Sequence, residues 1–311
     1  GNNYPIVPGT VTGTKINNYV VSNVNGKLTV TPAPLTLNAG STNSIYGDAI
    51  NPITATVIGG KNGEVLTATG STTVTPSFNV GGYPTTATLD TSVKSGNYNV
   101  VTVNPGTYTI TKAGLTATGK DATREYGDNN PGLETVVTGG RNGDTFTPAN
   151  ATTTATTTSD VNGYPTIPGN VTGSKINNYT VSNVNGTLTV TSAPFTLNAG
   201  NGSSVYGDSI NSITATVNGA KNGDPLNATG TTTATSSSDV NGYPTSATLN
   251  VSAKSGNYNV VTVNPGTYTI TKAGLTATAP TLSRVYGEPN GNLETVVTGG
   301  RNGDTFTPAN A

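Results

Sequence analysis

Four residue types are absent from the chain: among its 311 residues there is no His, Cys, Met or Trp. Without His or Cys the chain cannot build a Ser-His-Asp triad, a thiol nucleophile, an imidazole- or thiolate-bound zinc site, or a disulfide. Charged residues account for only 9% of the chain, where an average domain has about 25%. With a net charge of -1, neither a polybasic nucleic-acid-binding surface nor an acidic disordered tail is expected. We therefore expect no nucleic-acid partner and no cofactor.

The chain also lacks any apolar run of about 18 residues, the length that a membrane-spanning helix needs. No membrane insertion is therefore expected in this segment. The first residue is Gly1 rather than Met, from which we expect a piece of a longer or processed chain. The 40 Gly and 19 Pro indicate a chain that is rich in loops but still folded.

Short motifs recur along the chain at a fixed spacing, from Tyr46 to Tyr126, Tyr206 and Tyr286. The first is Tyr-Gly followed by an acid, at Tyr46-Gly47-Asp48, Tyr126-Gly127-Asp128, Tyr206-Gly207-Asp208 and Tyr286-Gly287-Glu288. The second is basic-Asn-Gly-acid, which predicts an exposed β-turn, at Lys61–Glu64, Arg141–Asp144, Lys221–Asp224 and Arg301–Asp304. The third is Asn-Tyr, with the tyrosines at Tyr19, Tyr98, Tyr179 and Tyr258. Repetition at a fixed period predicts an array of similar structural modules.

The sequence also repeats at twice the spacing of these motifs. Lys94–Thr118 and Lys254–Thr278 are identical, so two diverged types of module alternate. The types differ near their ends, where one has Asn25-Gly26 and the other has Pro105-Gly106. We expect Asn-Gly to form a type I′ hairpin turn and Pro-Gly to form a type II turn.

Apolar and polar residues alternate in several short stretches, including 35–39, 53–57 and 108–111. This period of two predicts strands with one buried and one solvated face, and we expect no helix of more than about two turns. The predicted fold is all-β, with tandem antiparallel Ig-like β-sandwich modules that form an elongated rod; β-grasp-like modules are the alternative. The side chains expected in the core are Tyr46, Ile53, Val57, Tyr98, Tyr108 and Ile110.

Module boundaries are expected where the last strand of one repeat runs directly into the first strand of the next. The predicted division is a second half-module at 1–32, whole modules at 33–112, 113–192 and 193–272, and a first half-module at 273–311. The linking segments are too short to act as flexible tethers. Modules of this length form only a small core, so contact with neighbouring modules should help to hold each one.

The order of these motifs resembles that of the YGX-type MBG repeats, which occur in tandem in very large bacterial surface proteins, including filamentous-haemagglutinin-like adhesins. The best copy consists of Tyr126, Asn130-Pro131, Asn142-Gly143-Asp144, Gly163-Tyr164-Pro165, Asn178-Tyr179-Thr180 and Val184–Thr191. Two copies depart from the pattern, with Asn211-Ser212 and Asn290-Gly291 in place of Asn-Pro. The resemblance implies a secreted adhesin or stalk and names no receptor.

The Tyr-Gly-acid motif has a structural interpretation and a metal-binding one. Structurally, the Tyr is a core ring, the Gly meets a special backbone angle or close packing, and the acid caps turn amides. Alternatively, the acids bind calcium together with backbone carbonyls; the candidates are Asp48, Asp128, Asp208 and Glu288. Calcium needs about six to eight oxygen ligands. The chain has 15 acids in all and no Asp-x-Asp-x-Asp-Gly loop, which favours the structural interpretation.

Catalysis is not expected. Asp160 and Asp239 could form a glycosidase-type carboxylate pair, but the equivalent stretch of the preceding repeat is Phe78-Asn79-Val80. The 14 tyrosines could stack on sugars, yet most recur at fixed positions beside Gly or Pro, as core or turn residues do.

The predicted function is a structural stalk or fibre segment of an extracellular bacterial adhesin or filament, on the cell surface and without catalysis. It would serve cell adhesion or biofilm formation. The alternative is an adhesive module that binds host or matrix glycans or a like chain. The expected partners are further copies of the same repeat, head to tail, with residues 1–32 packing against 273–311 of the preceding copy.

Overall fold

The computed structural model of the chain describes residues 2–309. Within this range the regular structure consists of β-strands and four 3₁₀ helices of three residues each. The prediction of an all-β fold of tandem repeats, without long helices, is confirmed. The described residues form two compact units, and each is treated by itself. The first holds residues 2–118, 135–150 and 168–184; the second holds 119–134, 151–167 and 185–309.

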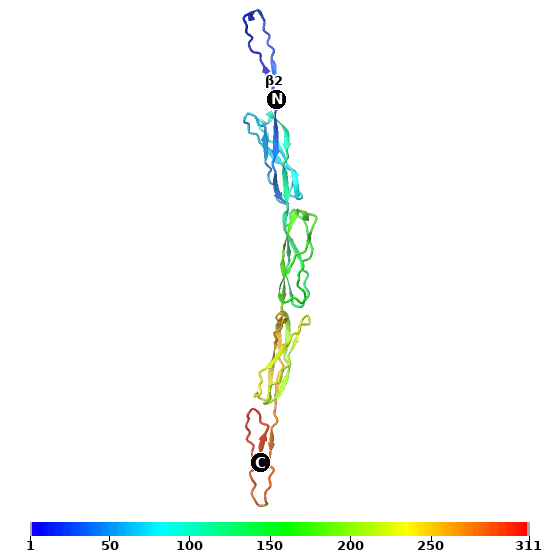
Figure 1. Cartoon of the computed structure of the whole chain (residues 1–311), viewed down its shortest axis with the longest axis vertical. Coiled ribbons are helices and arrows are strands. Elements are labelled where there is room, and N and C mark those ends of the chain that lie inside the picture. Colours follow the sequence, from blue (N-terminus) through cyan, green and yellow to red (C-terminus); the bar gives the residue numbers. More distant parts are fainter. Residues whose placement is uncertain (1, 310–311) are drawn as a thin grey trace. The chain divides into compact units, whose positions relative to one another are not determined.

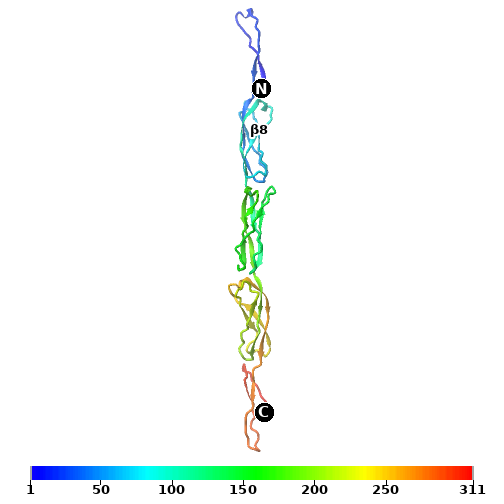
Figure 2. The same ribbon diagram turned by 90° about the vertical axis from the view of Figure 1, so that its right-hand side faces the viewer.

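The elements of the first two predicted ranges are shown in blue to cyan in Figure 1. Residues 1–32 contain β1 (Asn3–Ile6), η1 (Ile16–Asn18) and β2 (Gly26–Thr29). Residues 33–112 contain β3 (Ala33–Ala39), β4 (Thr42–Ile45), β5 (Ala55–Ile58), β6 (Ala68–Ser71), β7 (Gly81–Pro84), β8 (Thr86–Leu89), η2 (Ser95–Asn97), β9 (Tyr98–Asn104) and β10 (Thr107–Thr111). In Figure 2 the strand β8 is labelled from a second side.

The following ranges repeat this order of elements. Residues 113–192 contain β11 (Ala113–Gly119), β12 (Ala122–Glu125), β13 (Thr135–Thr138), β14 (Thr147–Pro148), β15 (Asn162–Thr166), β16 (Val171–Thr172), η3 (Ile176–Asn178), β17 (Tyr179–Val184) and β18 (Gly186–Thr191). Residues 193–272 contain β19 (Ala193–Asn198), β20 (Gly202–Val205), β21 (Thr216–Asn218), β22 (Ala228–Thr232), β23 (Gly242–Leu249), η4 (Ser255–Asn257), β24 (Tyr258–Asn264) and β25 (Thr267–Thr271). Residues 273–311 contain β26 (Thr276–Thr278) and β27 (Val296–Thr298).

Two long parallel stretches of chain form the spine of module 33–112. Strand β3 pairs in parallel with β9, and β4 pairs in parallel with β10. Each parallel pair gains an antiparallel partner at one edge, which gives the sheets β5-β3-β9 and β4-β10-β7. In module 193–272 the sheets β21-β19-β24 and β20-β25-β23-β22 repeat the arrangement.

These pairings correct the expectation of wholly antiparallel sheets. The first strands of a module pair in parallel with its last strands, which lie much later in the chain, for example Ala33 with Tyr98. Alternation of apolar and polar residues gives the buried face of a strand but not the direction of its partner. Sheets here are therefore mixed, with both kinds of neighbour on a central strand.

The prediction of a hairpin at the end of each module is also wrong. Strands β9 and β10, on either side of Pro105-Gly106, pair with β3 and β4 and not with each other. Neither Gly106 nor Asn25-Gly26 has the positive φ that the expected turns require. A Cβ atom on Gly106 would instead collide with the carbonyl oxygen of Gly40 in the neighbouring stretch. Glycine occupies this position because two backbones approach closely there.

The predicted face of β10 is confirmed: Tyr108 and Ile110 are buried and Thr109 is exposed. Tyr46 is also buried, and the other predicted core residues, Ile53, Val57 and Tyr98, are half-buried. One hydrophobic cluster in the first unit combines β10 with Ala113 and Leu115 of β11. The apolar core therefore continues across the sequence boundary between repeats.

Candidate functional site at the module joints

Contacts between consecutive repeats concentrate at what we call joints: the first between modules 33–112 and 113–192, the second between 113–192 and 193–272, and the third between 193–272 and 273–311. At the first joint, which lies within the first unit, the carboxylate of Asp144 accepts two tyrosine hydroxyl hydrogen bonds. Tyr46 of one module donates at 2.9 Å and Tyr179 of the next donates at 2.8 Å, both to Oδ2. The two rings meet edge to face, with centroids 5.5 Å apart.

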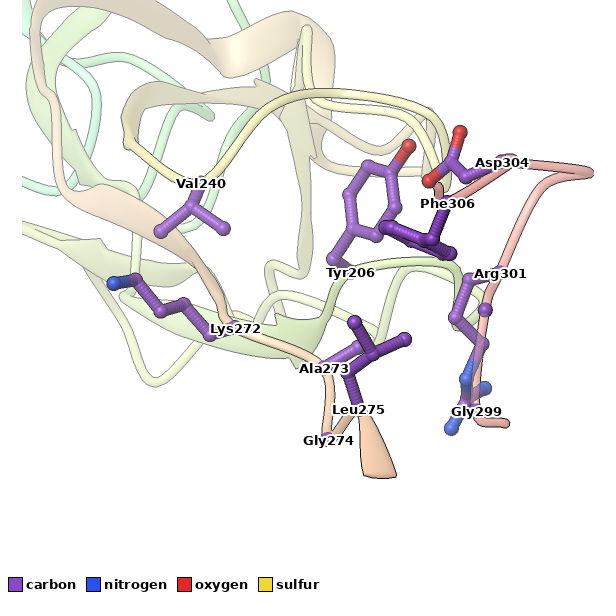
Figure 3. A pocket seen from close by; sticks show the side chains of 11 residues that line it. Tyr206, Val240, Lys272, Ala273, Gly274, Leu275, Gly299, Arg301, Asp304 and Phe306 are labelled. Atoms are coloured by element: carbon purple, nitrogen blue, oxygen red, sulfur yellow. The ribbon is translucent and has the colours of Figure 1, made fainter. Parts of the chain in front are cut away.

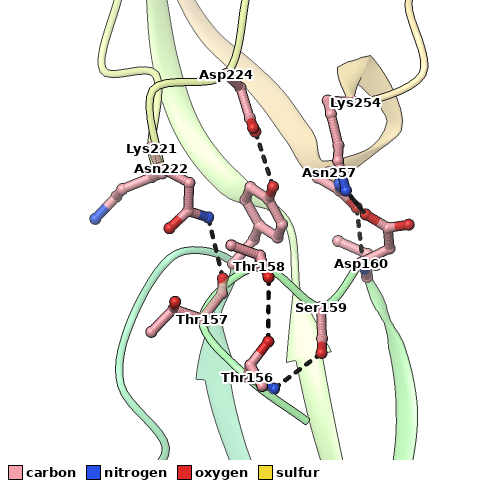
Figure 4. A network of polar contacts seen from close by, with 12 residues as sticks. Thr156, Thr157, Thr158, Ser159, Asp160, Lys221, Asn222, Asp224, Lys254 and Asn257 are labelled. Atoms are coloured by element: carbon pink, nitrogen blue, oxygen red, sulfur yellow. Dashed lines mark hydrogen bonds and ion pairs between the residues drawn. The ribbon is translucent and has the colours of Figure 1, made fainter.

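The second joint, within the second unit, repeats this arrangement. Asp224, labelled in Figure 4, accepts hydrogen bonds from the hydroxyls of Tyr126 and Tyr258, at 2.8 and 2.7 Å. The two rings again meet edge to face, at 5.4 Å. Tyr126 and Tyr258 are both buried, so the carboxylate holds two hydroxyls at the edge of an apolar cluster. Because hydrogen bonds to a charged acceptor are roughly twice as strong as neutral ones, this group is a strong polar link between repeats.

The glycine of the Tyr-Gly-acid motif lies against the basic residue of the next repeat. Gly127 has a φ of +87°, and a Cβ atom there would lie 2.5 Å from Cβ of Lys221. The following acid, Asp128, forms an ion pair with the same lysine at 3.1 Å. Equivalent ion pairs join Asp48 to Arg141 and Asp208 to Arg301.

The basic-Asn-Gly-acid motif forms the other half of the joint. Asn222 and Gly223 both have positive φ, of 55° and 72°, and the amide of Asp224 donates to the carbonyl of Lys221 at 3.0 Å. These are the features of a type I′ turn, so the prediction of a β-turn is confirmed. The side-chain amide of Asn222 also donates to the carbonyl of Thr157 in the preceding repeat, at 3.1 Å. The turn thus presents its base, amide and acid to the neighbouring module.

A second polar contact at the same joint involves the residues just before Gly-Tyr-Pro. Asp160 accepts hydrogen bonds from Lys254 and Asn257, both at 2.7 Å, while Asn257 Oδ1 accepts the backbone N–H of Val161 at 2.8 Å (Figure 4). At the first joint, Asn79 takes the place of Asp160: it accepts hydrogen bonds from Lys175 and Asn178 at 3.0 Å. Asp160, which the sequence offered as a possible catalytic carboxylate, therefore lies in a joint.

Burial at the joints changes the acidity of three tyrosines, Tyr126, Tyr179 and Tyr258. Desolvation, reinforced by the bond to Asp144, raises the pKa of Tyr179 to about 12. Desolvation likewise raises the pKa of Tyr126 and Tyr258. The hydrogen bond from Lys254 lowers the pKa of Asp160. The tyrosines are therefore neutral hydrogen-bond donors throughout the physiological pH range.

The tyrosines of the Tyr-Gly-acid motif differ in burial from copy to copy, whereas its glycines share one backbone conformation. Tyr46 and Tyr126 are buried, Tyr206 is half-buried and Tyr286 is exposed. All four glycines of the motif, Gly47, Gly127, Gly207 and Gly287, have positive φ.

The calcium candidates Asp48, Asp128 and Asp208 each lie beside a single base, and Glu288 lies in the half-module 273–311. No group of three or more acids close enough to hold a metal ion occurs among residues 2–309. Within the same residues, no helix has the length and apolar character needed to cross a membrane.

Nothing in the Tyr-Gly-acid or the basic-Asn-Gly-acid motif alone links it to the other. Tyr46 and Asp144 lie 98 residues apart, and Tyr126 and Asp224 have the same separation. The signal that could have found the pairing of the Tyr-Gly-acid and basic-Asn-Gly-acid motifs is their shared spacing. Because both motifs recur with the same spacing, a contact between them at one joint is expected at the other joints as well.

Two tandem segments, residues 115–189 and 195–269, match the model of the MBG domain of the YGX type. The resemblance inferred from the motifs is thereby confirmed for these two segments, which are similar to the MBG domain of the YGX type and lie in tandem. No curated protein matches the chain.

Among solved structures, the chain is similar to the crystal structure of the I9-I11 tandem from titin, at 10% sequence identity. The match covers 77% of this chain and 100% of the titin chain, with a TM-score of 0.21.

Proposed function

We propose that the chain is a stalk or fibre segment of an extracellular bacterial adhesin or filament, which links or projects other parts on the cell surface without catalysis. The observation that carries the proposal is the joint. At both complete joints a carboxylate of one repeat is bonded to a tyrosine of its own module and to a tyrosine of the preceding one.

Such a joint resists bending for a physical reason. Rotation of one module against the next would separate two buried rings and leave a carboxylate with one of its two partners lost. Leaving the hydroxyl of a buried tyrosine without its acceptor costs about 1–3 kcal/mol. The ion pairs at the same joints are part-exposed and contribute less, about 0–1 kcal/mol each.

The repeated use of polar side chains at the joints also supports a structural role. Asp160, Asp144 and Asp224 have hydrogen-bond partners in the adjacent module. Side chains that are tied to structural partners in every copy are poor candidates for a reacting acid or base. The residue types that are missing from the sequence point the same way.

Glycan binding is the competing function. It would need exposed, flat aromatic rings. Tyr83 and Tyr164 are half-buried, and their hydroxyls donate to the backbone of Asn79 and Asp160 at 2.8 Å. A glycan array probed with the full chain tests this alternative, and specific binding that is lost in Tyr83→Ala or Tyr164→Ala would support it.

Small-angle X-ray scattering of the full chain tests the stalk proposal. A strand of ten residues spans roughly 33 Å, so an array of stiff modules should advance about 35–45 Å per module. The expected profile is that of an extended particle, and Asp224→Ala should make it more flexible. Asp128→Asn, which alters only a part-exposed ion pair at the same joint, is the matched control. A compact particle about 50 Å across would contradict the proposal.

A further inference from the structure

The chain enters and leaves module 33–112 at opposite ends of its spine. It enters at Ala33, which lies opposite Tyr98 in the parallel pair of β3 and β9. It leaves at Thr111, which lies opposite Ile45 in the parallel pair of β4 and β10. A pull on the two ends of the module therefore acts along these strands in opposite senses and tends to slide one stretch past the other.

Sliding differs from peeling in the number of hydrogen bonds that carry the load. When two strands are pulled apart from the same end, their bonds break one after another, and each carries the load alone. When parallel strands are pulled from opposite ends, the evenly spaced bonds along the pair share the load and must break together. Unfolding under load is governed by the unfolding rate, which falls when many bonds must break in one step.

Side-chain groups bond the two stretches where the strand pairs are interrupted. The side-chain amide of Asn104 donates to Oδ1 of Asn38 at 2.7 Å. The backbone N–H of Thr107 donates to Oγ of Ser41 at 2.9 Å. The stretch that enters the module is thus bonded to the stretch that leaves it across the interruption as well as within the strands.

The parallel spine recurs in the following modules. In module 193–272, β19 pairs in parallel with β24 and β20 with β25, as β11 does with β17 and β12 with β18 in the preceding module. Asn264 donates to Oδ1 of Asn198 at 2.7 Å. The N–H of Thr267 again has a side-chain acceptor, Oδ1 of Asn201, at 2.7 Å. The bonds across the interruption are therefore a feature of the repeat and not of one copy.

The last strand of a module passes into the next repeat without a loop. After β10, Lys112 alone precedes β11. At the end of module 193–272, Figure 3 shows the chain running on from Lys272 to Leu275, one residue before β26. Load at these two places therefore passes along the backbone from one spine to the next repeat.

The middle of the module lies outside this load path. Residues 47–97 contain β5 to β8 and connect the two stretches of the spine. Strand β5 pairs with the outer edge of β3, β7 pairs with the outer edge of β10, and β6 pairs with β8. While the spine holds, a pull on the module ends puts no tension on this segment.

We propose that the chain is a tether that resists tension, in which the parallel spine of each module holds against a pull along the chain. The inference goes beyond the proposed stalk, because a stalk that only spaces other parts need not withstand being pulled. Tension of this kind arises when one end of the chain is held at a surface and the other end is drawn away from it.

Single-molecule pulling of the full chain carrying Gly96→Cys tests the proposal in two directions. In the first, handles on peptide tags at the two chain ends load every spine from opposite ends. In the second, one handle stays at the N-terminal end and the other is attached to the new sulfur, which loads β3 and β9 from the same end. Cysteine is absent from the chain, and a Cβ atom at Gly96 would meet nothing within 4 Å. The same protein, with the same equilibrium stability, is thus measured both ways.

At equal load, module 33–112 should unfold at least about tenfold faster in the second direction than in the first, because its bonds then break singly. Unfolding of a module lengthens the chain by roughly 200–250 Å, which identifies the event in the record. Equal lifetimes in the two directions would overturn the inference. They would leave the stalk proposal intact, since scattering tests that proposal separately.

Two variants separate the spine from the rest of the core. Thr107→Pro removes the N–H that donates to Ser41, at the first residue of a strand, and should shorten the lifetime under end-to-end load about fivefold to tenfold. Ile53→Val lies outside the spine and trims a side chain packed against the core. It should lower the urea midpoint but leave the lifetime under load unchanged within about twofold.

The order of these effects supports or contradicts the load path. A lifetime that follows the urea midpoint equally in Thr107→Pro and Ile53→Val would overturn the inference. The comparison of the two pulling directions requires no change within the spine, so it gives its answer even if Thr107→Pro does not fold.

Discussion

Thr245 shows how one hydroxyl ties two backbone stretches together inside a module. The residue is 2% exposed, and its hydroxyl donates to the carbonyl of Gly200 and accepts the N–H of Gly266, both at 2.9 Å. Thr85 makes the same two bonds, to Gly40 and Gly106. The threonine therefore fixes the spine where its two parallel stretches are interrupted.

Thr245→Val should destabilise the protein by about 1–3 kcal/mol, because it leaves a part-buried carbonyl and a part-buried N–H without this partner at nearly unchanged volume. Urea denaturation measures the loss. Thr248→Val in the same strand changes an exposed residue and should alter stability by less than about 0.5 kcal/mol. Equal effects of the two substitutions would contradict the assigned role of the hydroxyl.

Ionisation of Tyr179 should weaken the first joint at alkaline pH. Its pKa is raised to about 12 in the folded protein, whereas an unfolded tyrosine ionises near about 10. The unfolded state therefore loses its proton first, so the contribution of Tyr179 to stability is complete below pH 10 and is lost as the pH rises through 12.

Absorbance at 295 nm reports tyrosine ionisation during an alkaline titration. Tyr179→Phe should remove one group that titrates near pH 12 and leave the earlier part of the curve unchanged. If the missing group instead titrates near pH 10, the tyrosine is not desolvated in the folded joint.

At the level of elements, the turn after β12 and the turn after β20 meet the basic-Asn-Gly-acid turns of the following repeats. Gly127→Ala introduces both a strained positive φ and a collision with Lys221. Gly287 has a similar φ of +91°, but a Cβ atom there would meet nothing within 4 Å. Comparing the two substitutions separates backbone strain from the joint contact.

We expect Gly287→Ala to cost about 1–2 kcal/mol through strain alone, in the turn that contains it. Gly127→Ala should cost a further 1–3 kcal/mol or so, because a side chain is forced into a packed contact. Hydrogen exchange of the amides of Asp128 and Glu288, each bonded across its own turn, measures the two losses locally. Equal losses would mean that the Tyr-Gly-acid turn does not touch its neighbour.

Asp224 and Asp128 of the second joint should contribute differently to the free energy of unfolding. Asp224→Asn weakens bonds to two buried tyrosine hydroxyls and should cost about 2–4 kcal/mol. Asp128→Asn removes an ion pair in which both side chains are more than a third exposed, and should cost less than about 1 kcal/mol. Thermal unfolding of the two variants checks the order, and a larger loss for Asp128→Asn would reverse the assignment.

Local sequence was sufficient for the elements whose pattern is local. The alternation at Tyr108, Thr109 and Ile110 predicted the strand and its buried face, and Asn62-Gly63 predicted a turn that has positive φ at both residues. It was insufficient where the partner is distant. The glycine after Pro105 was interpreted as a turn, although its position is set by the backbone of Gly40, near the start of the same module.

The joint was missed for the same reason. The Tyr-Gly-acid motif was interpreted within one module, where a buried ring and a special glycine are sufficient explanations. The reason why both residues recur is the contact with the next repeat, which no local pattern encodes. The positions of the site residues could thus be predicted from the sequence, whereas their partners could not.

At the scale of the whole molecule, modules that share a core across their joints should not unfold independently. The cluster at the first joint joins Tyr108 and Ile110 to Leu115 and Tyr179, and that at the second joins Tyr126 to Tyr258. In an array of this kind, stability is a sum of module and interface terms, so strong interfaces make neighbouring modules unfold together.

Differential scanning calorimetry of the full chain tests this claim most directly. An independent module of about 80 residues would unfold with a van 't Hoff enthalpy of about 55 kcal/mol. We expect a value clearly above about 55 kcal/mol for the native chain, and a fall towards it when Asp224→Ala breaks the second joint. A native chain that already unfolds with the enthalpy of a single module, unchanged by Asp224→Ala, would show that the modules unfold independently.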